Sequence, residues 1–181
     1  RGDRIRSWNI LKAIAAIAPT HVFALIDPAD APDTGRAEIE AIAASLHAER
    51  PAHSRTGAMA RALITGAPAS VCAFASPELQ AQVDRLLAER PIRTIYAFSG
   101  QMAQFVPEHL EGRRFIMDFV DMDSAKFASF AADREGVSGF ANRMEGRRLL
   151  AFEQRTAERA DLSLFVSAAE SILFRSITGL G

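Results

Sequence analysis

The chain has 181 residues, of which 49% are apolar and 24% are charged, and its formal net charge is −1. This length fits one globular domain of ordinary size, and the balanced charge gives no electrostatic case for binding nucleic acid. A single cysteine, Cys72, excludes an intrachain disulfide framework and a zinc site built from cysteines. Cys72 is therefore expected to be a small residue of the apolar core.

No targeting or membrane-spanning segment is evident in the sequence. The first residues are charged and lack the apolar stretch of a signal peptide. The longest uncharged stretch, residues 62–77, contains glycine and proline and is shorter than the ~20 apolar residues that a spanning helix needs. A cytoplasmic protein is the expectation.

Apolar runs and helical periodicity alternate over the first half of the chain. Asp3 is expected to cap a first helix that Pro19 ends. Residues 22–26 are continuously apolar, which is typical of a strand covered on both faces. The spacing of apolar residues predicts a second helix over 35–47 and a short one over 57–65. Ser76, as cap, and Pro77, at the first helical position, predict the start of the next helix.

The second half continues this alternation. Residues 92–98, 115–120 and 162–166 are rich in β-branched and aromatic residues and predict three strands. A long helix is expected over 138–159, with Phe140, Met144, Ala151 and Phe152 on its buried face. Another helix is expected to begin near Ser124, and a closing helix follows Ser167.

Strands that alternate with helices indicate βαβ units and a parallel sheet. The fold class expected is therefore α/β, with a single Rossmann-like domain whose parallel sheet is flanked by helices. Ligands of such domains bind outside the carboxyl ends of the strands. The candidate positions are Gly2, Asp3, Asp27, Ser99, Gly100, residues 121–126 and Ser167.

The sharpest local motif is Asp121-Met122-Asp123-Ser124, directly after an apolar strand. Two carboxylates one residue apart can chelate magnesium or manganese. The pattern also occurs as the nucleophile motif of haloacid-dehalogenase hydrolases and as the metal motif of some sugar transferases. The alternative is that Asp121 or Asp123 caps the helix that begins near Ser124.

The other chemical motifs are few. Arg1, Arg4 and Arg6 gather with Gly2 at a predicted helix start, which suits either an anion or sugar-phosphate site or a solvated terminus. The four histidines are scattered and predict no metal site. Neither a glycine-rich dinucleotide loop nor a phosphate-binding P-loop follows any strand.

An ordered set of motifs resembles the family 4 glycosyltransferases, in particular the exopolysaccharide sugar transferases associated with bacterial PEP-CTERM systems. The motifs, in chain order, are Gly2-Asp3-Arg4-Ile5-Arg6, Thr65-Gly66-x-Pro68-x-Ser70, Phe98-Ser99-Gly100-Gln101-Met102-Ala103-Gln104, Asp118-Phe119-Val120-Asp121-Met122-Asp123-Ser124-x-Lys126, Leu149-Leu150-Ala151-Phe152-Glu153 and Leu164-Phe165-Val166-Ser167-x-Ala169-Glu170. The resemblance covers nearly the whole chain.

The resemblance implies half of a two-domain GT-B fold. Residues 1–181 match the N-terminal, acceptor-binding domain, while the C-terminal donor-binding domain and the first strand ahead of Arg1 are absent from the chain. The activity implied is a retaining hexosyl transfer from a nucleotide sugar to a saccharide, or a lipid-linked saccharide, in cell-surface polysaccharide synthesis. The resemblance implies no further cofactor and no metal. It does imply peripheral contact with the inner face of the membrane. This polypeptide alone is expected to be inactive.

The resemblance also shifts the roles expected of individual residues. Asp121 and Asp123 become acceptor-side groups and the candidates for a catalytic role. The substrate-binding residues it implies are Gly2, Asp3, Arg4, Ser99, Gln101, Asp121, Asp123, Ser124, Lys126, Ser167 and Glu170. Two alternatives stay open: a non-catalytic α/β module that binds a saccharide or a partner, and a phosphatase-type hydrolase that uses the Asp-x-Asp motif.

Overall fold

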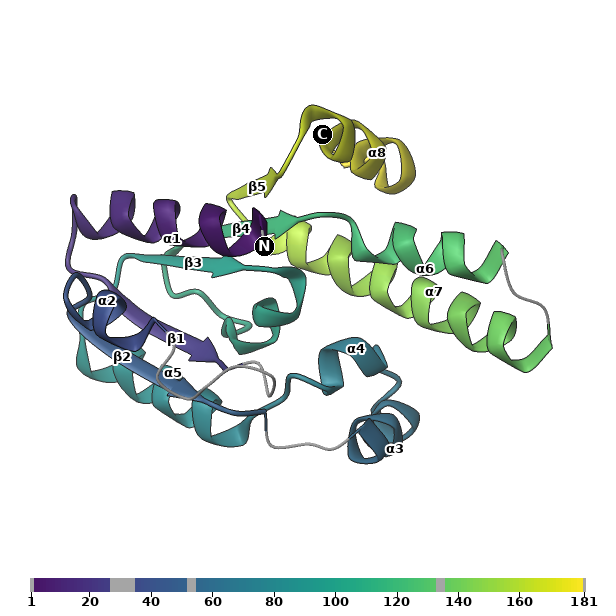
Figure 1. Ribbon diagram of the computed structural model, residues 1–181, viewed down its shortest axis with the longest axis horizontal. Helices are drawn as coiled ribbons and strands as arrows, with labels where there is room; N and C mark the ends of the chain where they lie inside the picture. The colour runs from purple at the N-terminus through teal and green to yellow at the C-terminus, as the bar shows by residue number, and fades with distance from the viewer. Residues whose placement is uncertain (1, 27–34, 52–54, 133–135, 181) are drawn as a thin grey trace. The chain divides into compact units, whose positions relative to one another are not determined.

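The computed structural model describes residues 2–26, 35–51, 55–132 and 136–180 (Figure 1). The fold is α/β: its strands form parallel sheets of two and three strands, flanked by helices. This confirms the predicted fold class. The chain divides into two compact units, residues 1–52 with 76–89, and residues 53–75 with 90–181. The assignment of residues 1–181 to a single domain stays a prediction.

The first unit is built on a two-stranded sheet. Strands β1 (His21–Leu25) and β2 (Ser45–Glu49) pair in parallel, with His21 opposite Ser45 and Leu25 opposite Glu49. Its helices are α1 (Gly2–Ala15), α2 (Arg36–Glu40) and α5 (Pro77–Glu89). Side chains support the pairing, because His21 Nδ1 lies 2.8 Å from Ser45 Oγ and the His47 ring stacks on Phe23.

The helix expected over 35–47 is wrong in its second half. Helix α2 ends at Glu40, and residues 45–49 form β2 instead. The alanine-rich segment has high intrinsic helix propensity, but pairing with β1 satisfies its backbone and overrides that weak preference. The capping role expected of Asp3 is also wrong, because α1 already begins at Gly2.

The start of α5 confirms the sequence prediction. Pro77 is its first residue, and Ser76 Oγ accepts a hydrogen bond of 3.1 Å from the Leu79 amide. Glu49, at the end of β2, bonds to the Ser76 hydroxyl and accepts from the same amide at 3.2 Å. Two oxygens thus satisfy an amide that the helix start would leave without a partner.

The second unit is built on a three-stranded parallel sheet of order β3-β4-β5 (Figure 1). The strands are β3 (Thr94–Phe98), β4 (Arg114–Val120) and β5 (Leu162–Phe165), all close to the predicted bounds. The helical elements are α3 (Arg55–Thr65), α4 (Ala69–Cys72), the 3-10 helix η1 (Gly100–Phe105), α6 (Asp123–Ala132), α7 (Gly136–Arg159) and α8 (Ala168–Thr178).

The core of this unit lies around the central strand β4. Phe115 and Met117 are fully buried there, and Phe152 of α7 packs against them. At the strand's next inward position, the Phe119 ring contacts Phe165 of β5 and Phe174 of α8, each at a centroid distance of 5.4 Å, and the latter two rings lie 5.0 Å apart. Buried aromatic side chains of this size supply much of the apolar burial that holds a small sheet to its helices.

The long helix α7 does not bury the face that its apolar spacing predicts. Its first half packs mainly against α6 (Figure 1). Phe140 is 57% exposed and Met144 36% exposed, so that part of the prediction is wrong. Close approach of the two helices occurs at Gly146, where an added Cβ would lie 3.4 Å from Phe127 Cβ. The buried positions farther along α7 are Leu149, Glu153 and Thr156.

A small alanine cluster joins α3 and α4. Ala58, Ala62 and Cys72 are buried together, which confirms the core role expected of the cysteine. The other side of α3 leaves Leu63 and Ile64 exposed. Over the ranges that the structure describes, no helix is long and apolar enough to cross a membrane.

Glu145 of α7 holds the start of α4. Its carboxylate accepts hydrogen bonds from the Ala69 amide (2.9 Å), the Ser70 amide (2.8 Å) and the Ser70 hydroxyl (2.7 Å). Replacing Glu145 by glutamine is expected to cost about 1–2 kcal/mol, because a neutral amide offers only one acceptor oxygen to three donors. Amide exchange at Ala69 and Ser70 should accelerate, as hydrogen-exchange mass spectrometry can measure.

The matched control for this clamp is Glu158→Gln on the same helix. Glu158 is exposed and no hydrogen bond ties it to α4 among the described residues. Equal exchange at α4 in both variants would contradict the role given to Glu145.

Candidate functional site

The carboxyl ends of β3, β4 and β5 bring together most of the residues that the sequence singled out. Because the three strands are parallel, their ends lie at one edge of the sheet. Ser99 and Gln101 follow β3, residues 121–126 follow β4, and Ser167 and Glu170 follow β5. Hydrogen bonds link these segments into a polar cluster, defined here as Ser99, Gln101, Asp121, Asp123, Ser124, Lys126, Glu153 and Glu170.

Two unusual backbone conformations mark this edge. Ser99 has φ +73° and ψ +136°, and Val120 has φ +68°. At Val120 the Asp121 amide donates to the Phe119 carbonyl at 2.9 Å, so the strand ends in a γ-turn. Such conformations cost about 1–3 kcal/mol each for residues with a side chain and persist only where the surroundings impose them. The turn directs Asp121 out of the strand.

Asp118 supports the turn from inside the sheet. It is fully buried in β4, where its Oδ1 accepts from the Val120 amide at 3.1 Å and its Oδ2 from the Tyr96 hydroxyl at 2.6 Å. Its carbonyl also accepts from the Ser99 amide at 2.8 Å. One residue therefore touches both strained positions, Ser99 and Val120.

A chain of side-chain hydrogen bonds runs across the edge. The Ser99 hydroxyl bonds to Gln101 Oε1, and Gln101 Nε2 donates to Asp123 Oδ2 at 2.8 Å. Lys126 Nζ then donates to Asp123 Oδ1 at 2.9 Å and to Asp121 Oδ2 at 3.0 Å. Three of the four oxygens of the two aspartates are thus occupied, and Asp121 Oδ1 has no hydrogen-bond partner among the described residues.

The two aspartates hold Lys126 in its charged form. Partial burial of the ammonium acts against its charge, but the hydrogen bonds and charges of Asp123 and Asp121 outweigh this and raise the pKa of Lys126. All three side chains remain between one quarter and one half exposed. The cluster therefore presents both a proton donor and carboxylate acceptors to solvent.

Glu153 forms the buried side of the cluster. It is only 2% exposed, and it bonds to the Ser124 hydroxyl and accepts from the Ser124 amide at 3.1 Å. Burial, the largest effect, raises the pKa of Glu153 from its usual 4.5 to about 7; hydrogen bonds from Ser124 oppose the rise, and the nearby charge of Asp123 adds to it. The carboxyl is thus poised between its two protonation states near neutral pH.

Helix α8 closes the cluster on the side of β5. Ser167 caps this helix by accepting from the Glu170 amide at 3.2 Å, as the sequence predicts. Glu170 in turn accepts from the Met122 amide at 2.8 Å. Glu170 therefore holds the loop after β4, and Ser167 holds the start of α8. Both side chains have structural roles.

The remaining predicted residues lie in the first unit. Gly2 and Arg4 are exposed in the first turn of α1, and a Cβ at Gly2 would meet no atom within 4 Å. Local packing therefore does not require glycine there. Asp3 is also in this turn; its side chain, Arg1 and Asp27 lie outside the described residues.

The alternative roles of the Asp-x-Asp motif can be compared with this geometry. Helix α6 begins at Asp123, so neither Asp121 nor Asp123 occupies the flanking cap position. Lys126 takes one oxygen from each carboxylate, the pair that a bridging cation would need. Within the described part of the chain, no three histidine, cysteine, aspartate or glutamate side chains could together hold a metal ion.

Ser99 offers a test of stored backbone strain. Ser99→Gly and Ser99→Ala both remove the hydroxyl that bonds to Gln101, but only glycine adopts φ +73° without steric cost. The glycine variant is therefore expected to be more stable than the alanine variant by about 1 kcal/mol. Urea unfolding of both variants measures the difference, and equal stabilities would show that Ser99 is not strained.

Two members of this edge, Asp118 and Glu153, were not among the predicted site residues. Both carry a signal in the sequence: Asp118 interrupts an apolar strand, and Glu153 falls in line with Leu149 on the buried side of α7. A charged residue at a position that should be apolar is costly unless it is bonded. A charged residue in such a position is therefore a candidate site residue.

Comparison of the chain with protein-family models, with curated proteins and with solved structures finds no match.

Proposed function

We propose that the chain is the acceptor-binding domain of a retaining hexosyltransferase with the GT-B fold, acting in cell-surface polysaccharide synthesis. The observation that carries this proposal is the polar cluster at the carboxyl edge of the three-stranded sheet. All of its members, from Ser99 to Glu170, belong to the motifs that resemble family 4 glycosyltransferases.

The exposed groups of the cluster suit a sugar that carries neighbouring hydroxyls. Asp121 Oδ1, which accepts no hydrogen bond within the described part, can accept from one hydroxyl. Lys126, held close by at 3.0 Å from the other oxygen of Asp121, can donate to the next. Because the ion pairs fix both side chains, little conformational entropy is lost when a saccharide binds.

The donor, the second domain and the catalytic residues are proposed from the resemblance to family 4 glycosyltransferases. A nucleotide sugar is the donor, and a second domain supplies most contacts to its diphosphate, so residues 1–181 alone bind the acceptor without turning it over. Asp121 and Asp123 are the candidate catalytic groups. The protein acts in the cytoplasm, at the inner membrane face where lipid-linked acceptors lie, and the exposed apolar side of α3 is the surface that contacts the lipid.

Saccharide binding by this chain tests the proposal directly. Backbone NMR spectra are recorded while neutral hexose oligosaccharides are added, and shifts are expected at Ser99, Gln101 and residues 121–126. Asp123→Asn is expected to weaken binding by roughly tenfold, because it removes a charged acceptor and leaves one oxygen for the two donors Gln101 and Lys126. Asp84→Asn, at an exposed position of α5, is the matched control and should leave the saccharide affinity unchanged.

Any of the following results would contradict the proposal or favour an alternative. No saccharide-dependent shift, shifts confined to other surfaces, or equal affinity of Asp123→Asn and the unaltered chain would contradict an acceptor site. Binding of magnesium at millimolar concentration together with phosphatase activity would instead favour the Asp-x-Asp hydrolase. Saccharide binding without sugar transfer by the full gene product would identify a non-catalytic module.

A further inference from the structure

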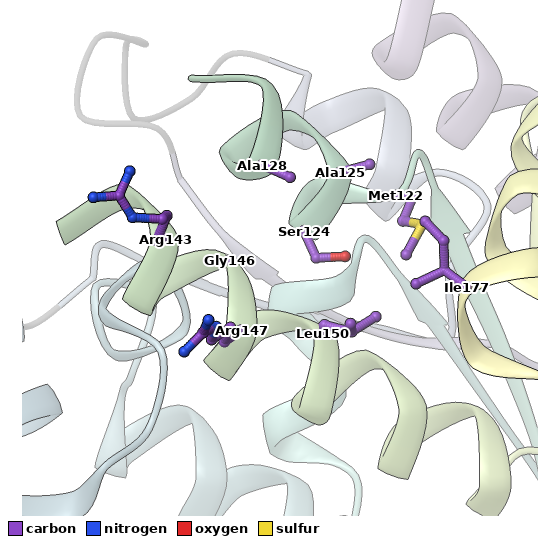
Figure 2. Close-up of a pocket in the computed structure, with 9 residues that line it drawn as sticks. All are labelled: Met122, Ser124, Ala125, Ala128, Arg143, Gly146, Arg147, Leu150 and Ile177. Carbon is purple, nitrogen blue, oxygen red and sulfur yellow. The ribbon is translucent and has the colours of Figure 1, made fainter. Parts of the chain in front are cut away.

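A largely apolar hollow lies between α6, α7 and α8, beside the polar cluster. Its volume is about 440 Å³, within the range of about 300–1,000 Å³ usual for small-molecule sites. Ala125 and Ala128 of α6 face Leu150 of α7 across it, and Ile177 of α8 closes one end (Figure 2). Small residues on α6, together with Gly146 on α7, leave this space open.

Two arginines of α7 lie at the opposite end of the hollow. Arg143 and Arg147 are one helical turn apart and both are exposed (Figure 2). They also line a smaller hollow of about 200 Å³, together with Phe140 and Met144. Arg143 and Arg147 therefore lie where the two apolar hollows meet.

Nothing in the described part of the chain neutralises these two charges. No ion pair or hydrogen bond joins Arg143 or Arg147 to another described residue, and no acidic residue stands three or four positions from either along α7. Glu145, between them in sequence, is bonded to α4 instead. Like charges at this spacing repel each other, so an anion placed between them would relieve the repulsion and bind both forks.

We propose that this hollow binds a single-chain anionic amphiphile, an alkyl chain that ends in a carboxylate or a phosphate. The anionic head lies between Arg143 and Arg147, and the chain runs along Ala128 and Leu150 toward Ile177. The head and the chain are both required, because the lining is apolar apart from the arginines and the bonded Ser124 hydroxyl. The hollow shares Ser124 with the polar cluster, but its occupation requires neither a saccharide nor the proposed function.

Titration with decanoate and decyl phosphate, each below its micelle concentration, tests this site. Isothermal calorimetry is expected to show saturable binding of one molecule per chain, and the tighter of the two ligands identifies the head group. Decanol and decyltrimethylammonium should bind at least tenfold more weakly, because they lack the anion that two guanidinium groups select. NMR shifts of the Leu150 and Ile177 methyl groups should accompany binding.

Variants separate the two parts of the site. Arg143→Gln and Arg147→Gln should each weaken binding by roughly tenfold, whereas Arg155→Gln, an exposed arginine elsewhere on α7, should not. Ala128→Leu fills the hollow and should block binding; Ser129→Leu, at the neighbouring exposed position, should leave it intact. No saturable binding, equal binding of the cationic amphiphile, or unchanged affinity in the arginine and Ala128 variants would overturn the proposal.

Discussion

Replacing Asp118 by alanine is expected to destabilise the chain by about 3–5 kcal/mol. The variant removes the fully buried carboxylate that accepts hydrogen bonds from the Tyr96 hydroxyl and the Val120 amide, and each hydrogen bond of this kind to a carboxylate contributes about 1.5–3 kcal/mol. A loss of this size removes a large part of the 5–15 kcal/mol that holds a typical domain together. Urea unfolding followed by circular dichroism measures it.

Two smaller variants show whether burial and bonding cause this effect. Tyr96→Phe removes the hydroxyl that donates to Asp118 and should cost only about 1–2 kcal/mol. Asp161→Ala removes an exposed carboxylate that accepts from the Phe115 amide at the start of β4, and should cost about 1 kcal/mol. A similar loss in all three variants would contradict the special role of Asp118.

Asp118 should also control the shape of the candidate site. Its side chain is bonded to the amide of Val120, whose γ-turn sets the direction of Asp121. In Asp118→Asn, which keeps the volume and one acceptor oxygen, amide shifts are expected to spread from Val120 to the Asp121–Lys126 pair. Shifts confined to β4 would show that the γ-turn keeps its conformation without the Asp118 carboxylate.

The second large effect is a pH dependence of stability that Glu153 creates. Its pKa is about 7 in the folded chain and 4.5 is its ordinary value, so the folded state holds a proton that the unfolded state has released between these values. The resulting stabilisation is full below pH 4.5 and is lost as the pH rises through about 7. A shift of this size corresponds to roughly 3 kcal/mol.

Glu153→Gln is expected to abolish this contribution. Glutamine is neutral at every pH, yet its amide can still bond to the Ser124 amide and hydroxyl. The variant should match the unaltered chain near pH 4.5 and exceed its stability by about 2–3 kcal/mol at pH 8. Urea unfolding at a series of pH values measures the free energy of unfolding of both proteins. The difference between the two pH curves isolates the contribution of Glu153.

Glu158→Gln serves as the control for this titration. Glu158 is exposed near the same end of α7, so the gain in stability at pH 8 that is expected of Glu153→Gln should be absent from its variant. Absence of this gain from Glu153→Gln would contradict the raised pKa of Glu153.

The elements of the fold that the sequence predicted are those with strong local signals. Of the five strands in the described ranges, four are apolar runs bounded by proline, glycine or charge. Ser76-Pro77 and Ser167 mark helix starts through hydrogen bonds within three residues. Strand β2 was missed because Leu46 and Ala48 sit in an alanine-rich segment whose local preference is helical. Only pairing with β1, some twenty residues away, makes that segment a strand.

The candidate site likewise has a part that the sequence predicts and a part that depends on the tertiary structure. The sequence by itself placed Ser99, Gln101, Asp121, Asp123 and Lys126 at strand ends, because parallel strands with helical connections bring their carboxyl ends to one edge. It could not show that Lys126 joins both aspartates, that Ser99 and Val120 adopt positive φ, or that Glu153 is buried against Ser124. These facts depend on contacts between segments far apart in the chain, such as Gln101 with Asp123, which only the packing of β3, β4 and α7 determines.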